Sequence, residues 1–170
     1  KLVKQYPDES MFNSLLSGLM RYKQVDLALK TYFDAKNTYS NNLKLNYITH
    51  SILMKIFGIS KRYDLSKSLF DECYTNKSIT IALCTCFAIS CFKSNHLKEI
   101  ENINNAIYYS GIKKDASFLK VIADGFMDKN MFENTLEELD ACIDCNVFLE
   151  KNTYVSIFSR CIESNKVVKG

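Results

Sequence analysis

An amphipathic helical hairpin recurs along this chain about every 35 residues. The segment 9 to 37, ESMFNSLLSGLMRYKQVDLALKTYFDAKN, carries two apolar stripes at helical spacing, separated by a short turn. Similar segments begin near residues 47, 81, 116 and 151, so the spacings are 38, 34, 35 and 35 residues. A single hairpin cannot bury both of its stripes, whereas a row of hairpins can stack into one continuous core. The pattern therefore predicts an all-α fold, an α-solenoid of stacked helix-turn-helix repeats.

The composition agrees with a helical fold. The chain has 170 residues, of which 47% are hydrophobic, but its five glycines and one proline are too few for the hairpin turns of an all-β fold. The longest apolar stretch, residues 79 to 92, is interrupted by polar residues and is shorter than the about 20 residues that span a bilayer. We therefore expect a single repeat array over residues 1–170, without a membrane as partner.

Both ends of the sequence suggest a larger parent. The chain begins at Lys1 rather than at Met, and its last helical pattern stops near Gly170. The fifth unit, which starts near residue 151, has room for only its first helix. We therefore expect this chain to be a piece of a longer protein.

Seven cysteines form an odd and irregularly spaced set, which favours free thiols in a reducing compartment over a disulfide framework. The segments CTC and CIDC invite a zinc interpretation. A structural zinc site needs four ligands with paired spacing, however, and neither His50 nor His96 has a partner near it in sequence. The sequence therefore predicts buried thiols, with no metal ion and no other cofactor. The cysteines are Cys73, Cys84, Cys86, Cys91, Cys142, Cys145 and Cys161.

No arrangement of residues points to catalysis. The second helix of the fourth unit has an acidic stripe one residue out of phase with its apolar stripe, which is typical of a solvated face. Asp124 and Asp128 share a helix face, but two carboxylates alone are weak support for a bound Mg²⁺. We therefore predict no enzymatic activity and no small-molecule substrate. The acidic stripe consists of Glu133, Glu137, Asp140 and Asp144.

The residues of the repeat also resemble those of a known family. First helices read MFNSLLSGLM, IADGFM and NTYVSIF, second helices read VDLALKTYF and YDLSKSLFDEC, and one unit ends on GIKKD. Together with the period, these segments resemble the pentatricopeptide repeat over about four and a half units. The tetratricopeptide repeat, another helical hairpin, expects a Trp, an aligned Gly and Tyr and a terminal Pro, and none of these recurs in register. The resemblance implies a right-handed superhelix.

The resemblance also implies single-stranded RNA as partner, with one nucleotide bound per repeat. The family reads each base with the fifth residue of the first helix and the last residue of the repeat. The fifth residues here are Asn13, Ser51, Thr85, Lys120 and Val155. The last residues are Asn46, Thr80, Asp115 and Glu150, and Asp8 stands at the same position before the first unit.

Two of these pairs have suitable chemistry for reading a base. Thr85 with Asp115 resembles the family's guanine-preferring pair, and Asn13 with Asn46 resembles a pyrimidine-preferring pair. Their hydroxyl, amide and carboxylate groups can donate to or accept from a base edge. At the second position, where the family often clamps bases with Val or Ile, only Ile48 fits.

The other pairs depart from the family pattern. Ser51 with Thr80 is ambiguous, Lys120 with Glu150 can satisfy itself as an ion pair, and Val155 has no side-chain group that forms hydrogen bonds. A structural alternative stays open for the fifth position, because small polar residues are common on the exposed side of a helix. The sequence therefore predicts a binding surface in which the reading of bases is incomplete.

Charge separates the two kinds of helix. Summed over the predicted ranges, the first helices carry a net charge of +5 and the second helices −8. In solenoids of this family the first helices line the concave surface, so we expect that surface to attract phosphates. Tyr22, Tyr63, Tyr108 and Tyr109 can stack on bases, but burial tendencies favour the core for tyrosines beside helix turns. The predicted phosphate contacts are Arg21, Lys55, Lys61, Arg62 and Lys93.

These observations lead to one functional hypothesis with two alternatives. The first is a single-stranded RNA-binding segment of a protein of the mitochondrion or another organelle, acting in RNA processing, stability or translation. A structural or adaptor subunit of a large ribonucleoprotein, such as a mitochondrial ribosome, would hold rRNA and ribosomal proteins without a sequence code. The positive first helices favour RNA binding, whereas Lys120 and Val155 favour the adaptor. The third is the targeting arm of an RNA-processing enzyme.

Overall fold

The structure, a computed structural model, describes residues 8–39, 45–144 and 146–163. Within these ranges the chain forms nine helices and no strand. Their order is α1 (Glu9–Arg21), α2 (Val25–Tyr39), α3 (Tyr47–Ile59), α4 (Tyr63–Thr75), α5 (Ile81–Ser94), α6 (Glu99–Tyr109), α7 (Ala116–Asp128), α8 (Phe132–Asp144) and α9 (Lys151–Glu163). The predicted all-α solenoid is confirmed.

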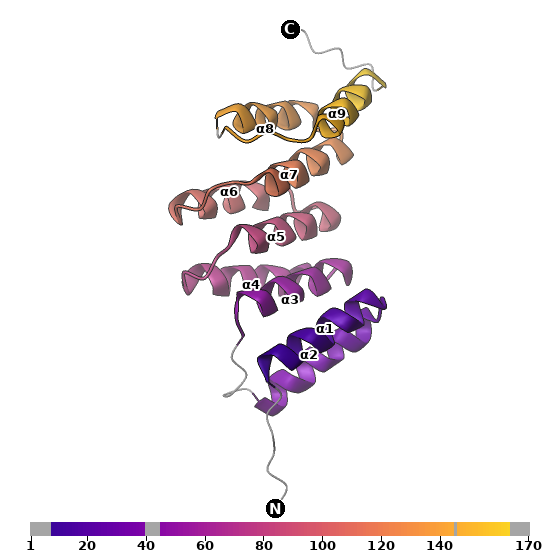
Figure 1. Cartoon of the computed structure of the whole chain (residues 1–170), viewed down its shortest axis with the longest axis vertical. Coiled ribbons are helices and arrows are strands. Elements are labelled where there is room, and N and C mark those ends of the chain that lie inside the picture. Colours follow the sequence, from indigo (N-terminus) through magenta and orange to yellow (C-terminus); the bar gives the residue numbers. More distant parts are fainter. Residues whose placement is uncertain (1–7, 40–44, 145, 164–170) are drawn as a thin grey trace, which may run out of the picture.

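The helices stack as successive layers along the long axis, with α1 and α2 at one end of the stack and α8 and α9 at the other (Figure 1). The odd-numbered helices begin at residues 9, 47, 81, 116 and 151, where the sequence pattern starts its units. Each of them packs on the next odd-numbered helix, most extensively α3 on α5 and α5 on α7. The layer of α1 and α2 is inclined to the others, and α1 packs less extensively on α3. We refer to the surface formed by the odd-numbered helices as the first-helix face.

Side chains at helical spacing fill the space between layers. Leu16, Leu53, Phe87 and Ile122 lie on successive first helices and are fully buried, and Ile103 of α6 is buried in the same core. The core is continuous from α1 to α9 across the described residues. Each layer therefore depends on its neighbours to cover its apolar stripe, as expected for a repeat protein.

The helix ends follow one recurring backbone pattern. A residue in the left-handed conformation follows the helix, and the next N–H reaches back to a carbonyl of the last turn, as when Gln24 N donates to Leu19 O at 2.8 Å. This Schellman arrangement satisfies carbonyls that the helix leaves unpaired. The left-handed residues are Lys23, Lys61, Asn95 and Asn130 inside units and Lys77, Gly111 and Asn146 between units, with φ from 53° to 65°.

The described cysteines are buried and the acidic stripe of α8 is exposed, as the sequence predicts. Cys73, Cys84, Cys86 and Cys91 are free and buried and Cys142 is buried, while Cys145 and the side chain of Cys161 lie outside the described part. Burial raises the pKa of the Cys84 thiol to about 12, so this thiol is protonated and unreactive at neutral pH. All four residues of the acidic stripe are exposed. No helix among the described residues is long and apolar enough to cross a membrane.

The prediction that the tyrosines beside helix turns lie in the core is wrong for three of the four. The side chains of Tyr22, Tyr108 and Tyr109 are 77%, 78% and 74% exposed, because they lie at helix ends, beyond the stretch that the neighbouring layer covers. Tyr63 is half-buried and stacks on His96, with ring centroids 3.6 Å apart.

Candidate nucleic-acid interface

A groove of about 630 Å³ on the first-helix face brings one predicted reader pair together. Asn13 comes from the middle of α1, and Asn46 immediately precedes α3. The predicted clamp Ile48 and the predicted phosphate contact Arg21 line the same groove. Four residues chosen from sequence position alone therefore surround one cavity between the first two units.

The two asparagines of this groove are in different states. Asn46 caps α3, and its Oδ1 accepts from the backbone N–H of Ile48 at 2.8 Å and of Thr49 at 3.0 Å. These donors fix the orientation of the amide, so its Nδ2 group is left to donate elsewhere. The Oδ1 atom of Asn13 is buried and accepts no hydrogen bond from any described residue. A buried acceptor without a donor is unfavourable, and a ligand N–H would satisfy it.

Two last residues of other repeats, Thr80 and Asp115, serve as helix caps as well. The hydroxyl of Thr80 accepts from Leu83 N at 3.2 Å, and Asp115 Oδ1 accepts from Phe118 N at 2.8 Å. Glu150 precedes α9 and is exposed. A small polar residue before an apolar helix is the sequence signal of an N-cap, which the interpretation as base readers overlooked.

The fifth residues of the second and third units are turned back on their own helices. The Ser51 hydroxyl donates to Tyr47 O at 2.9 Å, and the Thr85 hydroxyl donates to Ile81 O at 2.8 Å. Each oxygen still has lone pairs with which to accept a hydrogen bond. Their roles as readers stay predictions, since a hydroxyl that donates inward can only accept from a base.

The fourth and fifth units present a different set of groups. Lys120 is exposed and lies near Asp124, whose pKa is raised by burial against the opposing pull of Lys120. No ion pair joins Lys120 to Glu150 among the described residues. Asp128 instead pairs with Arg160 of α9 at 2.8 Å, which uses one of the two carboxylates considered for Mg²⁺.

Val155, the fifth residue of α9, is 54% exposed. Two further apolar side chains of the same helix, Phe158 and Ile162, are also exposed. This end of the first-helix face therefore offers apolar contact, and Val155 itself offers no group for hydrogen bonding with a base edge.

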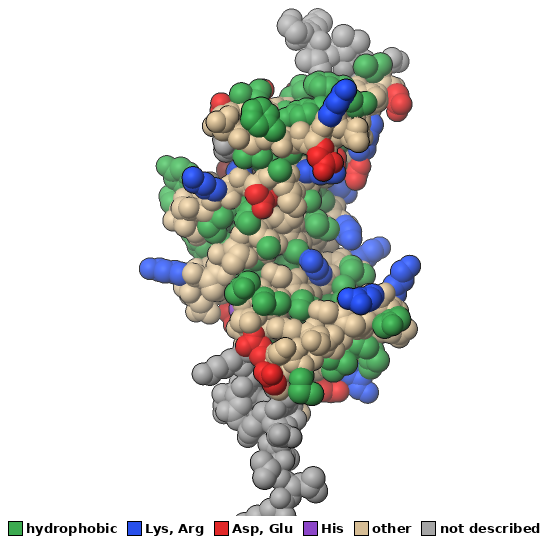
Figure 2. All heavy atoms as spheres, viewed as in Figure 1, with side chains coloured by type: hydrophobic (Ala, Val, Ile, Leu, Met, Phe, Trp, Pro, Cys, Tyr) green, Lys and Arg blue, Asp and Glu red, His purple; other side chains and the backbone are tan. Residues whose placement is uncertain are grey.

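Four of the five predicted phosphate contacts lie at the edge of the solenoid where the first helices end. Figure 2 shows Lys and Arg side chains gathered along this edge. Arg21 is the last residue of α1, Lys93 is near the end of α5, and Lys61 and Arg62 lie in the turn after α3. Lys55, in the middle of α3, is exposed. Much of the charge assigned to the first helices thus belongs to their ends and turns.

Arg62 is the one predicted phosphate contact with an ion-pair partner in the described structure. Its guanidinium donates to both carboxylate oxygens of Asp64, at 3.1 and 2.8 Å. This bidentate pair lowers the pKa of the Asp64 carboxyl and occupies two donors of Arg62. Arg62 is therefore a weaker candidate for a phosphate contact than Arg21 or Lys55.

The sequence analysis missed a polar cluster on the side of the second helices. Glu138 of α8 is buried, with Oε2 at 3.7 Å from Lys114 Nζ and Oε1 at 3.5 Å from Asn104 Nδ2. A charge count treats Glu138 as one more residue of an acidic helix. Its position three residues before Ala141, between the apolar Leu136 and Leu139, was the only available signal.

Comparisons with known proteins identify the fold. No protein-family model and no curated protein sequence matches the chain. The crystal structure of the pentatricopeptide repeat protein PPR10 from maize matches 94% of this chain with a TM-score of 0.75 and 15% identity. The same protein in complex with an 18-nt psaJ RNA element matches 95% with a TM-score of 0.78. This chain spans 23% of the length of either structure. The chain therefore has the fold of a pentatricopeptide-repeat solenoid.

Proposed function

We propose that the chain binds single-stranded RNA on its first-helix face. The observation that carries this proposal is the groove between α1 and α3, in which Asn13, Asn46, Ile48 and Arg21 converge. Among the described residues, no donor reaches the buried Oδ1 of Asn13 and no acceptor takes the Nδ2 group of Asn46. The solenoid of similar fold in complex with RNA supports the same class of ligand.

The hydrogen-bonding pattern of this groove suits a pyrimidine. Nδ2 of Asn46 would donate to a carbonyl oxygen of the base, while Oδ1 of Asn13 would accept from a ring or exocyclic N–H. The exposed side chain of Ile48 would contact the face of the base, and Arg21 would neutralise a phosphate. Uracil presents a carbonyl beside its ring N–H, and cytosine presents a carbonyl and an exocyclic N–H on one edge, so either base would satisfy both asparagine side chains.

The experiment is a binding titration that separates base reading from charge. We would measure fluorescence anisotropy of labelled single-stranded RNA, duplex RNA and single-stranded DNA with the 170-residue chain over a range of salt concentrations. Asn13→Ala should weaken binding to pyrimidine-rich RNA by roughly tenfold, the effect expected for the loss of one hydrogen bond between uncharged groups. Binding to purine-rich RNA should be weakened less. Lys55→Ala should weaken binding to all sequences equally and reduce the salt dependence. Equal binding of all nucleic acids, or binding only at low salt, would contradict the proposal.

The biological setting follows as part of the same proposal. We propose action in a mitochondrion or another organelle, in RNA processing, stability or translation, by capture of a short single-stranded segment. A binding role without catalysis is consistent with buried, protonated thiols such as Cys84. The first test is the location of a tagged full-length protein in cells, together with sequencing of RNA that crosslinks to it.

One observation favours the adaptor as a second candidate. Val155, Phe158 and Ile162 make the fifth first helix apolar on its exposed side, where a base reader would be polar. A subunit of a ribonucleoprotein would use such a surface for protein or rRNA backbone contacts. If the Asn13→Ala variant still co-sediments with ribosomal particles, the adaptor role would be supported over sequence-specific RNA binding.

A further inference from the structure

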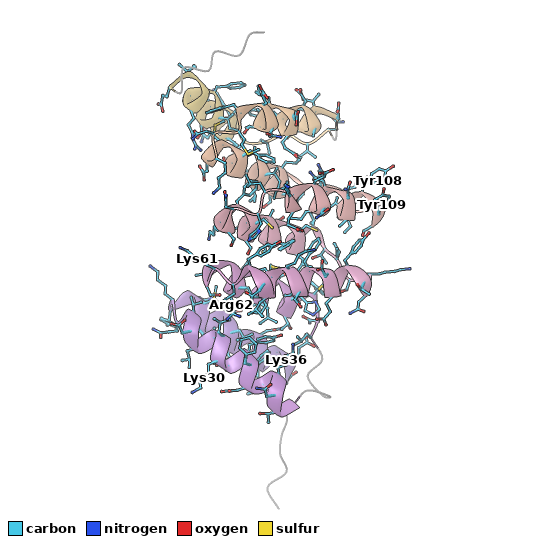
Figure 3. The ribbon with its side chains drawn as sticks, turned by 180° about the vertical axis from the view of Figure 1, so that it is seen from behind. Lys30, Lys36, Lys61, Arg62, Tyr108 and Tyr109 are labelled. Atoms are coloured by element: carbon cyan, nitrogen blue, oxygen red, sulfur yellow. The ribbon has the colours of Figure 1, made fainter. Side chains whose placement is uncertain are left out.

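The edge where successive units are joined has a composition unlike the rest of the surface. Here the second helices end and the next first helices begin. Exposed tyrosines stand at two adjacent helix ends, Tyr74 near the end of α4 and Tyr108 and Tyr109 at the end of α6. Figure 3 shows Tyr108 and Tyr109 projecting from this edge, away from the edge near Lys61 and Arg62. The tyrosines therefore lie apart from the predicted phosphate contacts.

A groove of about 500 Å³ lies between the two loops at this edge. One wall comes from the loop after α4, with Tyr74 and Lys77, and the other from the loop after α6, with Tyr109. No carboxylate is among the described residues that line it. The groove thus combines two aromatic rings with a cation and is open to solvent. Its lining residues are Tyr74, Thr75, Lys77, Ile79, Tyr109, Ser110 and Ile112.

The backbone holds these groups in place. Lys77 has a left-handed conformation with φ of 53°, and its N–H donates to Tyr74 O at 3.1 Å. In the next loop Ile112 N donates to Ile107 O at 3.1 Å, which closes the end of α6 beside Tyr109. Neither Lys77 nor the exposed Lys113 forms an ion pair among the described residues. Both ammonium groups are therefore available to an anionic ligand.

We propose that this groove is a second subsite for single-stranded RNA, in which an unpaired base stacks on Tyr109 and Tyr74 while a phosphate contacts Lys77. Aromatic rings flanked by lysines are the arrangement that binds unpaired nucleotides, because every base has a π-face and every nucleotide a phosphate. A duplex keeps its bases stacked and cannot insert one. Lys77, in a described lining without a carboxylate, attracts the phosphates of RNA and would repel a protein partner with a basic surface.

This inference rests on the proposed RNA-binding function but uses different residues. The groove between α1 and α3 lies on the first-helix face and reads hydrogen-bonding groups of a base. The edge groove lies where units are joined and recognises the aromatic face of any base. RNA that occupies both would pass from the first-helix face over the edge of the solenoid.

The test uses two variants of Tyr109 and one control variant of the whole chain, with a labelled 20-nucleotide single-stranded RNA. Tyr109→Ala should raise the Kd roughly tenfold, the effect expected for the loss of one base–aromatic stack. Tyr109→Phe keeps the ring and should bind like the parent. Leu27→Ala is the control for the loss of an exposed apolar side chain, since Leu27 is 48% exposed on α2 and lines neither groove. RNA containing 4-thiouridine should crosslink to the peptides that carry Tyr74 and Tyr109.

The outcomes separate this inference from the proposed function. If Tyr109→Ala binds like the parent while Lys55→Ala is weaker, the edge subsite is overturned and RNA binding on the first-helix face stands. If the parent binds no single-stranded RNA, both fall. An equal loss in Tyr109→Phe, or an equal loss for duplex RNA, would overturn stacking as the cause. Unchanged RNA affinity with loss of a protein partner would assign the groove to that protein.

Discussion

A side-chain carbon on Gly125 of α7 would stand 2.3 Å from Cδ2 of the Phe92 ring on α5. Real Cβ atoms do not approach other atoms so closely. The ring of Phe92 is 7% exposed and also meets Phe126 edge-on, with centroids 5.2 Å apart. Gly125 therefore lets α7 lie close to α5, at one of the most extensive contacts between layers.

We predict that Gly125→Ala destabilises the fold. The added methyl group must displace a packed ring, and overpacking of this kind typically costs about 1–3 kcal/mol, more than the about 1 kcal/mol that Ala gains over Gly in a helix. Urea unfolding followed by circular dichroism measures the change in the free energy of unfolding. Gly18→Ala is the control, because no atom lies within 4 Å of a Cβ built there, and it should be neutral or stabilising. Equal effects of the two substitutions would contradict the prediction.

We predict that Lys23→Gly stabilises the chain. Lys23 ends the first hairpin turn with φ of 58°, a conformation in which a residue with a Cβ is strained by about 1–2 kcal/mol and Gly is not. Thermal unfolding should show a higher Tm. Lys23→Ala removes the same charge but keeps the Cβ, so it should leave the Tm unchanged or lower it. An equal rise in Tm for both variants would show that removal of the charge, and not the backbone conformation of residue 23, causes the stabilisation.

We predict that substitutions of Asn46 separate its two roles. Asn46→Ala should lower the free energy of unfolding by about 1 kcal/mol, because α3 loses its N-cap, and should also weaken RNA binding. Asn46→Asp keeps an oxygen for the cap but replaces the Nδ2 donor by a negative charge, so it should retain stability and still lose affinity. Unfolding and anisotropy measured on the same samples would test this. Full RNA affinity in Asn46→Asp would remove Asn46 from the proposed reader pair.

The starts of the repeat units could be predicted from the periodic sequence. The contacts between side chains of different units could not. The unit starts could be located because apolar residues such as Leu53, Phe87 and Ile122 repeat at one position of the first helices. The close approach of Gly125 to Phe92 joins residues from different units, which no local pattern contains. The burial of Glu138 likewise depends on Lys114 from another unit.

The candidate site shows the same division. Asn13 and Asn46 could be paired from their positions in the repeat, but their hydrogen bonds could not. The exposure of Tyr109 was missed because burial tendency describes a residue type, whereas the end of a helix depends on how far the next layer reaches. The edge groove needs two loops from successive units, and sequence spacing alone did not indicate that they enclose a cavity.

We predict that His50 makes stability depend on pH below neutrality. Its Nδ1 lies 3.3 Å from Cys73 Sγ, and burial lowers the pKa of His50 from its ordinary value of 6.5, against the opposing pull of Glu72 and Glu9. The unfolded chain therefore binds a proton on His50 at a higher pH than the folded chain does. As the pH drops below about 6.5, the free energy of unfolding should fall by at most about 1.4 kcal/mol per pH unit. It should level off below the pKa that His50 has in the folded chain.

The variant His50→Gln isolates this contribution. Urea unfolding at pH 7.5 and at pH 5.5 should show a larger loss of stability in the parent than in His50→Gln, since glutamine does not titrate. His96→Gln is the matched control, because His96 is exposed and stacks on Tyr63 at the surface. A parent that gains stability on acidification, or that behaves like His50→Gln, would show that the burial of His50 does not disfavour its charged form.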